Sequence, residues 1–246
     1  MSRAAPFGVG GTSLQQWQAS AELAQVPWLP VATLIPPAAR LVVLAPHPDD
    51  EVLACGGLLA AMAARQDDVL LIAVTDGEAS HPGTPGLAAR RQAESEYALA
   101  RLGFYVPRLK CQRLAMADGQ VAVGERQLVA HLIEQLRPGD YLLSTWRHDG
   151  HCDHEAAGRS AAQAAAATGA TLLEMPVWAW HWATPDDPRI PWQRAHKLQL
   201  SPAHLARKRH AIQAHISQLH STAGQPAVLP PATLERLMQP YELVFT

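Results

Sequence analysis

Short apolar runs alternate along the chain with longer stretches whose apolar positions recur at helical spacing. The runs predict strands at 41–45, 69–74, 105–114, 140–145, 171–176 and 196–200. The longer stretches predict helices at 51–65, 88–102, 124–136, 154–167 and 202–220. Because strands and helices take turns at this spacing, we expect βαβ units and a mostly parallel sheet of the α/β class.

The residues before this alternation have a different character. Residues 1–38 contain several prolines and Trp17. We interpret them as an N-terminal arm, with a short helix near 13–24, that packs on a single domain formed by residues 39–246. A chain of 246 residues and 26.6 kDa is long enough to build one such domain around a sizeable core.

Polar side chains that can bind a metal or transfer a proton follow the first predicted strand of this domain. Residues 45–51 read Ala-Pro-His-Pro-Asp-Asp-Glu, between an apolar strand and a helix. In open α/β sheets, ligands bind at the carboxyl ends of the strands. The adjacent carboxylates of Asp49 and Asp50 repel each other unless a cation holds at least one of them ionised. A divalent metal bound by His47 and one aspartate, with the other aspartate as a base, resolves the conflict; the alternative is a capped helix start.

A second polar cluster follows another predicted strand. Residues 146–154 read Trp-Arg-His-Asp-Gly-His-Cys-Asp-His and come directly after the apolar run 141–143. Two histidine-rich strand ends in one chain are hard to ascribe to core packing. The second cluster therefore favours a shared site over a helix cap.

These segments resemble motifs of a known family, the zinc-dependent N-acetylglucosaminyl-phosphatidylinositol deacetylases (PIG-L or LmbE-like). Residues 45–51 resemble its first motif, and His151-Cys152-Asp153-His154 resembles its His-x-Asp-His motif. Further matches follow in the family's order: Thr75-Asp76-Gly77-Glu78, Arg91-Gln92-Ala93-Glu94 with Leu102-Gly103, and a closing helix from Lys208 to Ser217-Gln218. The resemblance spans about residues 40–220.

The resemblance implies a Rossmann-like three-layer sandwich and a zinc-dependent N-deacetylase. It implies three ligands for Zn²⁺, namely His47, Asp50 and His154. Sites of this kind also accept Fe²⁺ or Co²⁺. The resemblance makes Asp49 the general base. It implies that His151 is protonated, so that it stabilises the oxyanion or delivers a proton to the leaving amine, and that Asp153 orients this imidazole.

Three further residues are predicted to contact the substrate. Arg91 stands where family members hold hydroxyl or phosphate groups; the alternative is a salt bridge to Glu94 within the same helix. Asp149 is expected either to hydrogen-bond a sugar hydroxyl or to fix its own turn. Trp178 belongs to the segment 175–182, whose alternating tryptophans would share one face of a strand, either as a platform for a sugar ring or as a packed core edge.

Composition narrows the partners and the compartment. A net charge of −2 and a pI near 6.6 give no basic footprint, so nucleic acid is not an expected partner. We find no apolar stretch of membrane-span length and no signal peptide. The three cysteines lie far apart, which argues against a disulfide framework and favours the reducing cytoplasm. Cys152 is expected to be a small buried residue, and Arg207-Lys208-Arg209 a solvated helix face.

We therefore expect a hydrolase that removes an N-acetyl group from a small-molecule partner, an amino sugar or its conjugate. A bound metal polarises the amide carbonyl and lowers the pKa of water, which addresses both difficulties of amide hydrolysis. The alternatives are a hydrolase of another amide or N-glycosidic bond, and a catalytically silent sugar- or metal-binding module. Asp49 and His151 argue against the silent module, because a binding site needs neither a base nor an acid.

Overall fold

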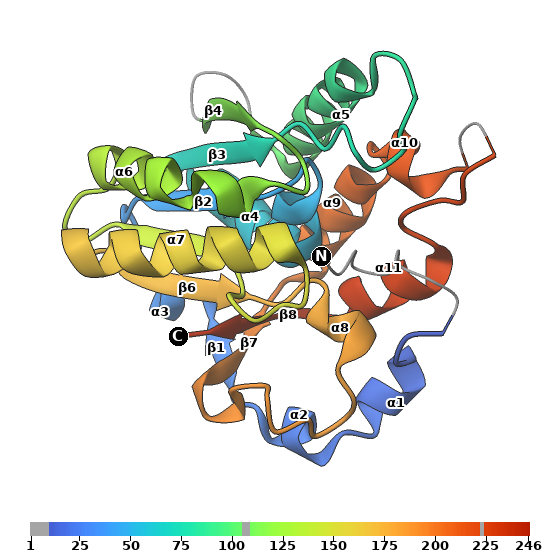
Figure 1. The fold of residues 1–246 in the computed structure, drawn as a ribbon. Coiled ribbons are helices and arrows are strands. Elements are labelled where there is room, and N and C mark those ends of the chain that lie inside the picture. Colours follow the sequence, from blue (N-terminus) through green and yellow to red (C-terminus); the bar gives the residue numbers. More distant parts are fainter. Residues whose placement is uncertain (1–9, 105–108, 222–223) are drawn as a thin grey trace.

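The computed structural model describes residues 10–104, 109–221 and 224–246, which build one eight-stranded sheet (Figure 1). Its strands are β1 (Trp28–Pro30), β2 (Leu41–Ala45), β3 (Val69–Thr75), β4 (Leu109–Met116), β5 (Tyr141–Thr145), β6 (Thr171–Met175), β7 (Ala195–Gln199) and β8 (Tyr241–Phe245). They are arranged in the order β1-β7-β8-β6-β5-β2-β3-β4. Every described pair is parallel except those that β8 makes with β6 and β7, which confirms the mostly parallel sheet.

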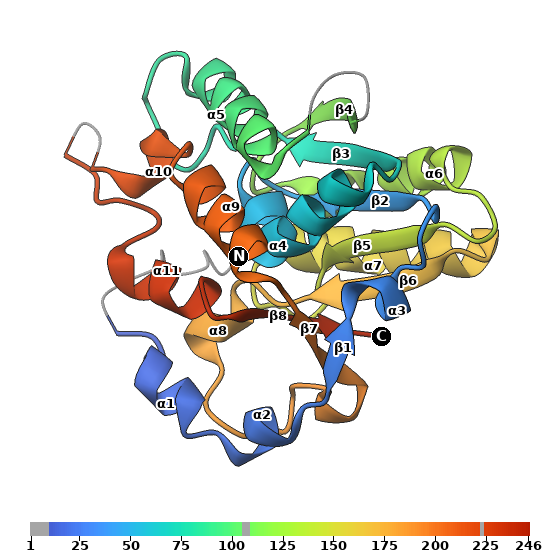
Figure 2. The ribbon, with the colours of Figure 1, turned by 180° about the vertical axis from the view of Figure 1, so that it is seen from behind.

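Helices cover both faces of the sheet, which confirms the three-layer sandwich. One layer contains α4 (Asp50–Arg65), α5 (Leu87–Leu102) and α9 (Pro202–Ile212), and the other contains α6 (Glu125–Gln135) and α7 (Cys152–Thr168). Figures 1 and 2 show these two layers from opposite sides. Shorter elements complete the fold: α1 (Leu14–Gln18), α2 (Ala21–Gln25), α3 (Val31–Leu34), α8 (Ala179–Trp182), α10 (Ile216–Leu219), α11 (Pro231–Leu237), and the 3₁₀ turns Val121–Gly124 and Trp192–Arg194.

The central strands feed two separate cores. Leu41 and Val43 of β2 pack into the core that contains Leu58 of α4, whereas Val42 and Leu44 pack into the core beneath α6 and α7. This division follows from the alternation of side chains along a strand, and burial on both faces explains why the strand is apolar throughout. Among the residues that the structure describes, no helix combines the length and apolar character needed to cross a bilayer.

Two predicted elements differ from the structure. The predicted helix 202–220 ends at Ile212 and resumes as the separate turn α10. The carboxylate of Glu94 accepts hydrogen bonds from the backbone N–H and the hydroxyl of Ser217 (2.8 and 2.6 Å), which holds the chain away from a continuous helix. The predicted strand 105–114 corresponds to β4, which runs on to Met116; residues 105–108 lie outside the described residues.

The N-terminal arm runs from two short helices into the edge of the sheet. Instead of one helix over 13–24, the structure has α1 and α2, because Ser13 and Ser20 each cap a new helix start with their hydroxyl oxygen. The strand β1 then pairs with β7. Trp17 is buried, donates its indole N–H to the carbonyl of Trp180 (2.8 Å) and packs edge-on against that ring. We infer that the arm folds together with the rest of the chain.

This inference predicts unequal costs for two tryptophan substitutions. Trp17→Ala should lower the free energy of unfolding by about 3–5 kcal/mol, because it empties a packed site in the core. Trp28→Ala is the matched control in the same arm, since 54% of that side chain is exposed and its removal should cost clearly less. Urea unfolding of both variants measures the difference, and an unchanged stability of Trp17→Ala would contradict the integral arm.

Candidate active site

The two polar motifs meet where the strand order reverses. From β2 the chain proceeds to β3 on one side, whereas β5 leads to β6 on the other, so the loops after β2 and β5 lie at the position where open α/β sheets bind ligands. His47 comes from the first loop, and His151 and His154 come from the second. Their rings lie close together, with centroids 4.7–5.3 Å apart. Topology thus joins segments that are about a hundred residues apart in the chain.

Asp50 lies at the centre of this arrangement. Its Oδ2 is 3.1 Å from Nδ1 of His47 and 3.3 Å from Nε2 of His154. The same oxygen accepts the backbone N–H of His47 (2.9 Å). Burial would raise the pKa of Asp50, but the two imidazoles hold it well below its ordinary value. The two histidines expected to bind the metal therefore converge on one oxygen of the third expected ligand, Asp50.

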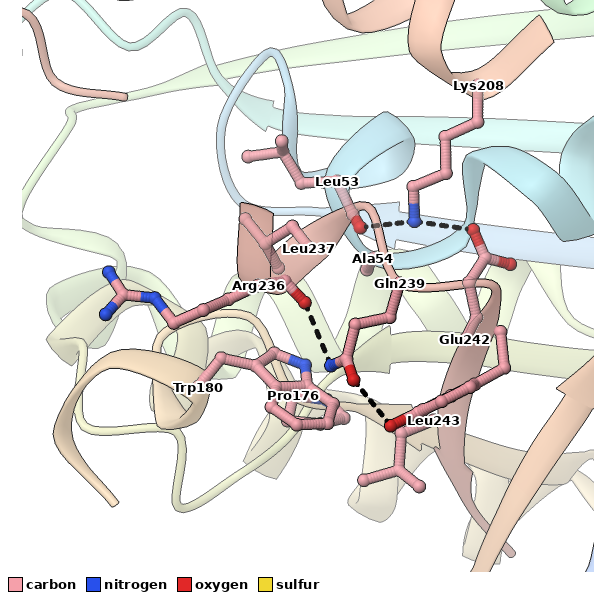
Figure 3. A pocket seen from close by; sticks show the side chains of 11 residues that line it. Leu53, Ala54, Pro176, Trp180, Lys208, Arg236, Leu237, Gln239, Glu242 and Leu243 are labelled. Carbon is pink, nitrogen blue, oxygen red and sulfur yellow. Dashed lines mark hydrogen bonds and ion pairs between the residues drawn. The ribbon is translucent and has the colours of Figure 1, made fainter. Parts of the chain in front are cut away.

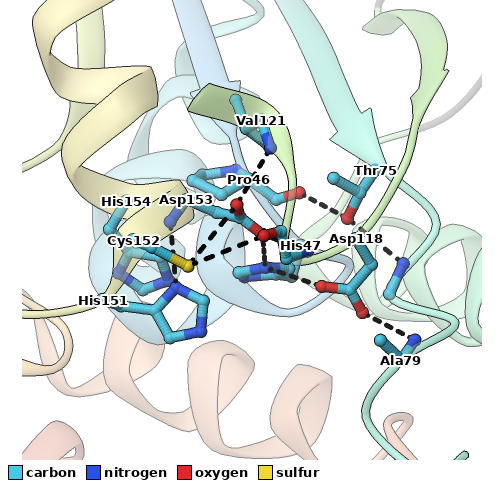
Figure 4. A network of polar contacts seen from close by, with 12 residues as sticks. Pro46, His47, Thr75, Ala79, Asp118, Val121, His151, Cys152, Asp153 and His154 are labelled. Carbon is cyan, nitrogen blue, oxygen red and sulfur yellow. Dashed lines mark hydrogen bonds and ion pairs between the residues drawn. The ribbon is translucent and has the colours of Figure 1, made fainter. Parts of the chain in front are cut away.

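The far nitrogens of His47 and His154 are each held by a carboxylate, and Figure 4 shows those that face His47. Nδ1 of His154 is 2.7 Å from Asp149, and Nε2 of His47 is 3.1 Å from Asp153 and 3.3 Å from Asp118. Carboxylates in this position fix the tautomer and the ring orientation of metal-binding histidines. They leave Nδ1 of His47 and Nε2 of His154 facing Asp50. His47, His151 and His154 also each offer a nitrogen within 4.8 Å of the others, so the donors gathered here fit a divalent metal.

The pKa values of His47 and His154 also favour a cation at this site. Burial alone would lower the pKa of both histidines, but the surrounding carboxylates raise the pKa of His154 to about 9 and that of His47 well above its ordinary value. The carboxylates around His47 and His154 therefore favour positive charge between them. A divalent cation would satisfy that demand in place of the imidazole protons, which must leave before the metal can bind.

Asp49 is held beside this group in an unusual backbone conformation. Its backbone angle φ is 154°, a value that residues other than glycine rarely adopt. Its N–H donates to Glu51 (3.1 Å), whose other oxygen accepts the hydroxyl of Ser95 (2.7 Å). Burial raises the pKa of Asp49 to about 7, against the opposing charge of Arg91, whose Nη2 lies 3.1 Å away. A carboxylate with that pKa is well suited to act as a base near neutral pH.

The two Nη groups of Arg91 are committed to protein atoms, whereas its buried Nε has no partner among the described residues. The Nη groups donate to the carbonyls of Gly77 (2.8 Å) and Pro48 (2.9 Å) as well as to Asp49. A Cβ at Gly77 would lie 1.9 Å from Nη1 of Arg91, so this close approach needs glycine. The expected alternative, a salt bridge to Glu94, is not formed, because Glu94 accepts from Ser217 instead. The geometry makes Arg91 a partner of Asp49.

The structure arranges His151 and Asp153 differently from the expectation. The imidazole of His151 caps α7 by accepting the N–H of Asp153 on Nδ1 (3.3 Å). Burial and the neighbouring histidines lower its pKa to about 3, so the ring is neutral and carries its proton on Nε2. The carboxylate of Asp153 faces His47 and accepts the N–H groups of Gly119 (2.7 Å) and Val121 (3.1 Å). It therefore supports a candidate metal ligand.

The remaining predicted residues surround this centre. Asp149 is fully buried and accepts the N–H groups of Val177, Trp178 and Ala179, so it holds the turn after β6 rather than its own turn, whose Gly150 N–H donates to Glu155. Trp178 is buried, with its ring centroid 6.4 Å from that of His151. The expected burial of Cys152 is wrong, since its thiol is exposed at the first residue of α7.

The tryptophans of the segment 175–182 do not all share a face. The strand β6 ends at Met175, and a helical turn, α8, follows. At about 100° per residue, Trp180 points away from the other two and packs on Trp17 in the core. Trp178 and Trp182 are four residues apart and both lie against Gly150, but only Trp178 lies beside His151, while Trp182 stacks on Trp146.

Sequence reasoning missed Asp118. It lies after β4, its Oδ2 accepts the N–H of Ala79 (2.8 Å), and its Oδ1 faces His47. The hydrogen bond with His47 lowers the pKa of Asp118 to about 2 despite its burial. In the sequence, Asp118 is marked only by an Asp-Gly pair after a predicted strand. Such pairs are common in turns, so this one did not indicate a functional residue.

The chain matches one protein family and several solved structures. The sequence profile of PIG-L, GlcNAc-PI de-N-acetylase, matches residues 42–165, about half of the chain, and the protein therefore belongs to this family. A relative from Bacillus anthracis, a probable N-acetyl-alpha-D-glucosaminyl L-malate deacetylase, is 25% identical over 194 residues, which cover 73% of this chain and 81% of that protein.

Two solved structures share the fold. N,N'-diacetylchitobiose deacetylase from Pyrococcus horikoshii has a TM-score of 0.57 at 20% identity and covers 74% of this chain and 71% of its own. A deacetylase of the teicoplanin biosynthesis pathway has a TM-score of 0.62 at 18% identity and covers 84% of this chain and 97% of its own.

The carboxylate behind His154 predicts a measurable effect on metal binding. Asp149→Asn removes the charge that orients this imidazole, so the affinity for Zn²⁺ should fall about 10–100-fold. Competition with a chromogenic chelator measures the affinity. Circular dichroism of the variant controls for folding, and a folded variant with full affinity would remove Asp149 from the support of the site.

Proposed function

We propose that this protein is a metal-dependent N-deacetylase in which His47, Asp50 and His154 bind Zn²⁺, with Fe²⁺ or Co²⁺ as possible replacements. One observation carries the proposal. Two imidazoles, each backed by a carboxylate, converge on Asp50 next to a buried carboxylate, Asp49, whose pKa lies near neutrality. A metal-binding module needs the first part of this arrangement, but only a hydrolase needs the second.

The residues around the metal site divide the reaction between them. The metal, when bound, polarises the amide carbonyl and makes water easier to deprotonate. Asp49 takes a proton from the water as the water oxygen adds to the acetyl carbon. The neutral His151 donates Nε2–H to the negative charge that develops on the carbonyl oxygen. When the C–N bond breaks, Asp49 returns the proton to the amine, and the products are a free amine and acetic acid, which loses the second water proton to solvent and leaves as acetate.

The family and the named relatives support an N-acetylated amino sugar or its conjugate as the substrate. Trp178 is buried beside His151, and we propose that its ring forms part of the apolar wall that borders the sugar. The three cysteines are free thiols, which supports a reducing compartment such as the cytoplasm. Acetate release from a panel of N-acetylglucosamine conjugates, with and without a chelator, tests the proposal. A metal-loaded enzyme that releases no acetate from any of them, yet binds them, would indicate the silent binding module.

The division between ligand and base predicts different behaviour for two adjacent aspartates. Asp49→Asn should bind the metal normally and lower turnover about 10²–10⁴-fold, as expected for a lost general base. Asp50→Asn should lower the metal content itself. Metal analysis together with acetate release compares the pair, and the reverse pattern would exchange the two roles.

The pKa of Asp49 predicts the acid side of the pH profile. The base must be ionised, so activity should fall as the pH drops and Asp49 takes up a proton. Burial raises its pKa to about 7 without a metal, and the charge of a bound metal lowers it, so this limb should lie below pH 7. The positive charge of Arg91 favours the ionised form, so Arg91→Met should raise the pKa of Asp49 and move this limb to higher pH. Arg91→Lys keeps a charge and should move it less. If the limb stays in place in Arg91→Met, the titrating group is not Asp49.

A further inference from the structure

Helix α4 is interrupted one turn after the residues of the candidate metal site. Cys55 has φ −135° and ψ 24°, values outside the helical range. The interruption divides α4 into a first turn, which carries Asp50 and Glu51, and a longer part that continues to Arg65. A turn cut off in this way lacks the support that a continuous helix would give it.

A buried ion pair fills the interruption (Figure 3). In an unbroken helix the N–H of Gly57 would donate to the carbonyl of Leu53. Here that carbonyl accepts from Nζ of Lys208 (2.9 Å), while the N–H groups of Gly57 and Leu58 donate to Glu242 (2.7 and 2.9 Å). Lys208 and Glu242 are 2.7 Å apart. The ammonium thus caps the end of the first turn, and the carboxylate caps the start of the second part, each with the sign that the helix dipole favours.

The glycines of α4 make room for this pair. A Cβ at Gly56 would lie 3.0 Å from Cγ of Lys208, and one at Gly57 would lie 2.4 Å from a methyl carbon of Leu200 and 3.3 Å from Glu242. Lys208 is only 2% exposed, so its expected place on a solvated helix face is wrong. An interior ion pair is weak evidence for stability, because well-packed apolar residues often serve as well or better. Its position in the helix break points to a geometric role.

We propose that Lys208 and Glu242 are positioning residues that hold the first turn of α4, and with it Asp50, where the two metal-binding imidazoles meet. This inference rests on the proposed function, because Asp50 is taken as a metal ligand. Glu51 fixes the start of the same turn through the N–H of Asp49 and the hydroxyl of Ser95. The ion pair fixes its end. Through it, α9 and the carboxy-terminal strand β8 support the site.

A double variant, Lys208→Met with Glu242→Gln, tests the proposal. It removes both charges together, so neither stays buried alone, and the glutamine keeps an acceptor oxygen for Gly57. We expect the affinity for Co²⁺, followed by its visible absorption, to fall about tenfold or more, and the absorption bands to shift. If the double variant does not fold, Gly56→Ala is the fallback, because its methyl group would press on Cγ of Lys208 (3.0 Å) while both charges stay paired; it should weaken Co²⁺ binding in the same direction.

Asp140→Asn is the matched control. It breaks the ion pair with Arg40 (2.7 Å), which precedes β2 and lies at the opposite end of the strands from the site. We expect a lower melting temperature but unchanged Co²⁺ affinity and spectrum. Equal effects in the control and the double variant, or a folded double variant with wild-type Co²⁺ binding, would overturn the positioning role. A wild-type protein that binds no Co²⁺ or Zn²⁺ would instead overturn the proposed function, and this inference with it.

Discussion

Buried negative charge is the constraint on which this structure depends. Five largely buried carboxylates gather at the carboxyl ends of the central strands: Asp49, Asp50, Asp118, Asp149 and Asp153. Desolvation penalises a buried charge unless a partner compensates for it. Here the partners are imidazoles, one guanidinium and backbone N–H groups, and their positions follow from that requirement. His47 and His154 become ordered side by side as a result. A divalent cation concentrates at one point the charge that two imidazole protons spread over two rings, which is why the same arrangement suits a metal.

The fold concentrates these charges without help from local sequence. The strands β5 and β2 are parallel neighbours, but the chain leads from them to opposite sides in the order β6-β5-β2-β3, so the two polar loops meet at the carboxyl ends of the central strands. The apolar strands beneath are buried on both faces and provide a rigid base. The interrupted start of α4 then lets two successive aspartates point to different partners.

That difference in partners separates the chemistry of Asp49 and Asp50. Asp50 faces two imidazoles, which hold its pKa well below the ordinary value. Asp49 faces Arg91 alone in a buried position, and its pKa rises to about 7. Neighbouring groups whose environments push their pKa values apart are the arrangement that acid–base catalysis requires. The unusual φ of Asp49 is the conformational cost of keeping these adjacent carboxylates apart.

The sequence by itself determined the alternating strands and helices, the α/β class and the two polar motifs, because these depend on the spacing of neighbouring residues. Only the tertiary structure decided which carboxylate faces which imidazole. Asp153 is two residues from His151, yet its carboxylate contacts His47, which lies in the loop after another strand. Lys208 belongs to a basic run that reads as a solvated surface, but packing of α9 on α4 buries it against Glu242. Periodicity encodes the face of an element, whereas partners distant in the chain are set by how the layers pack.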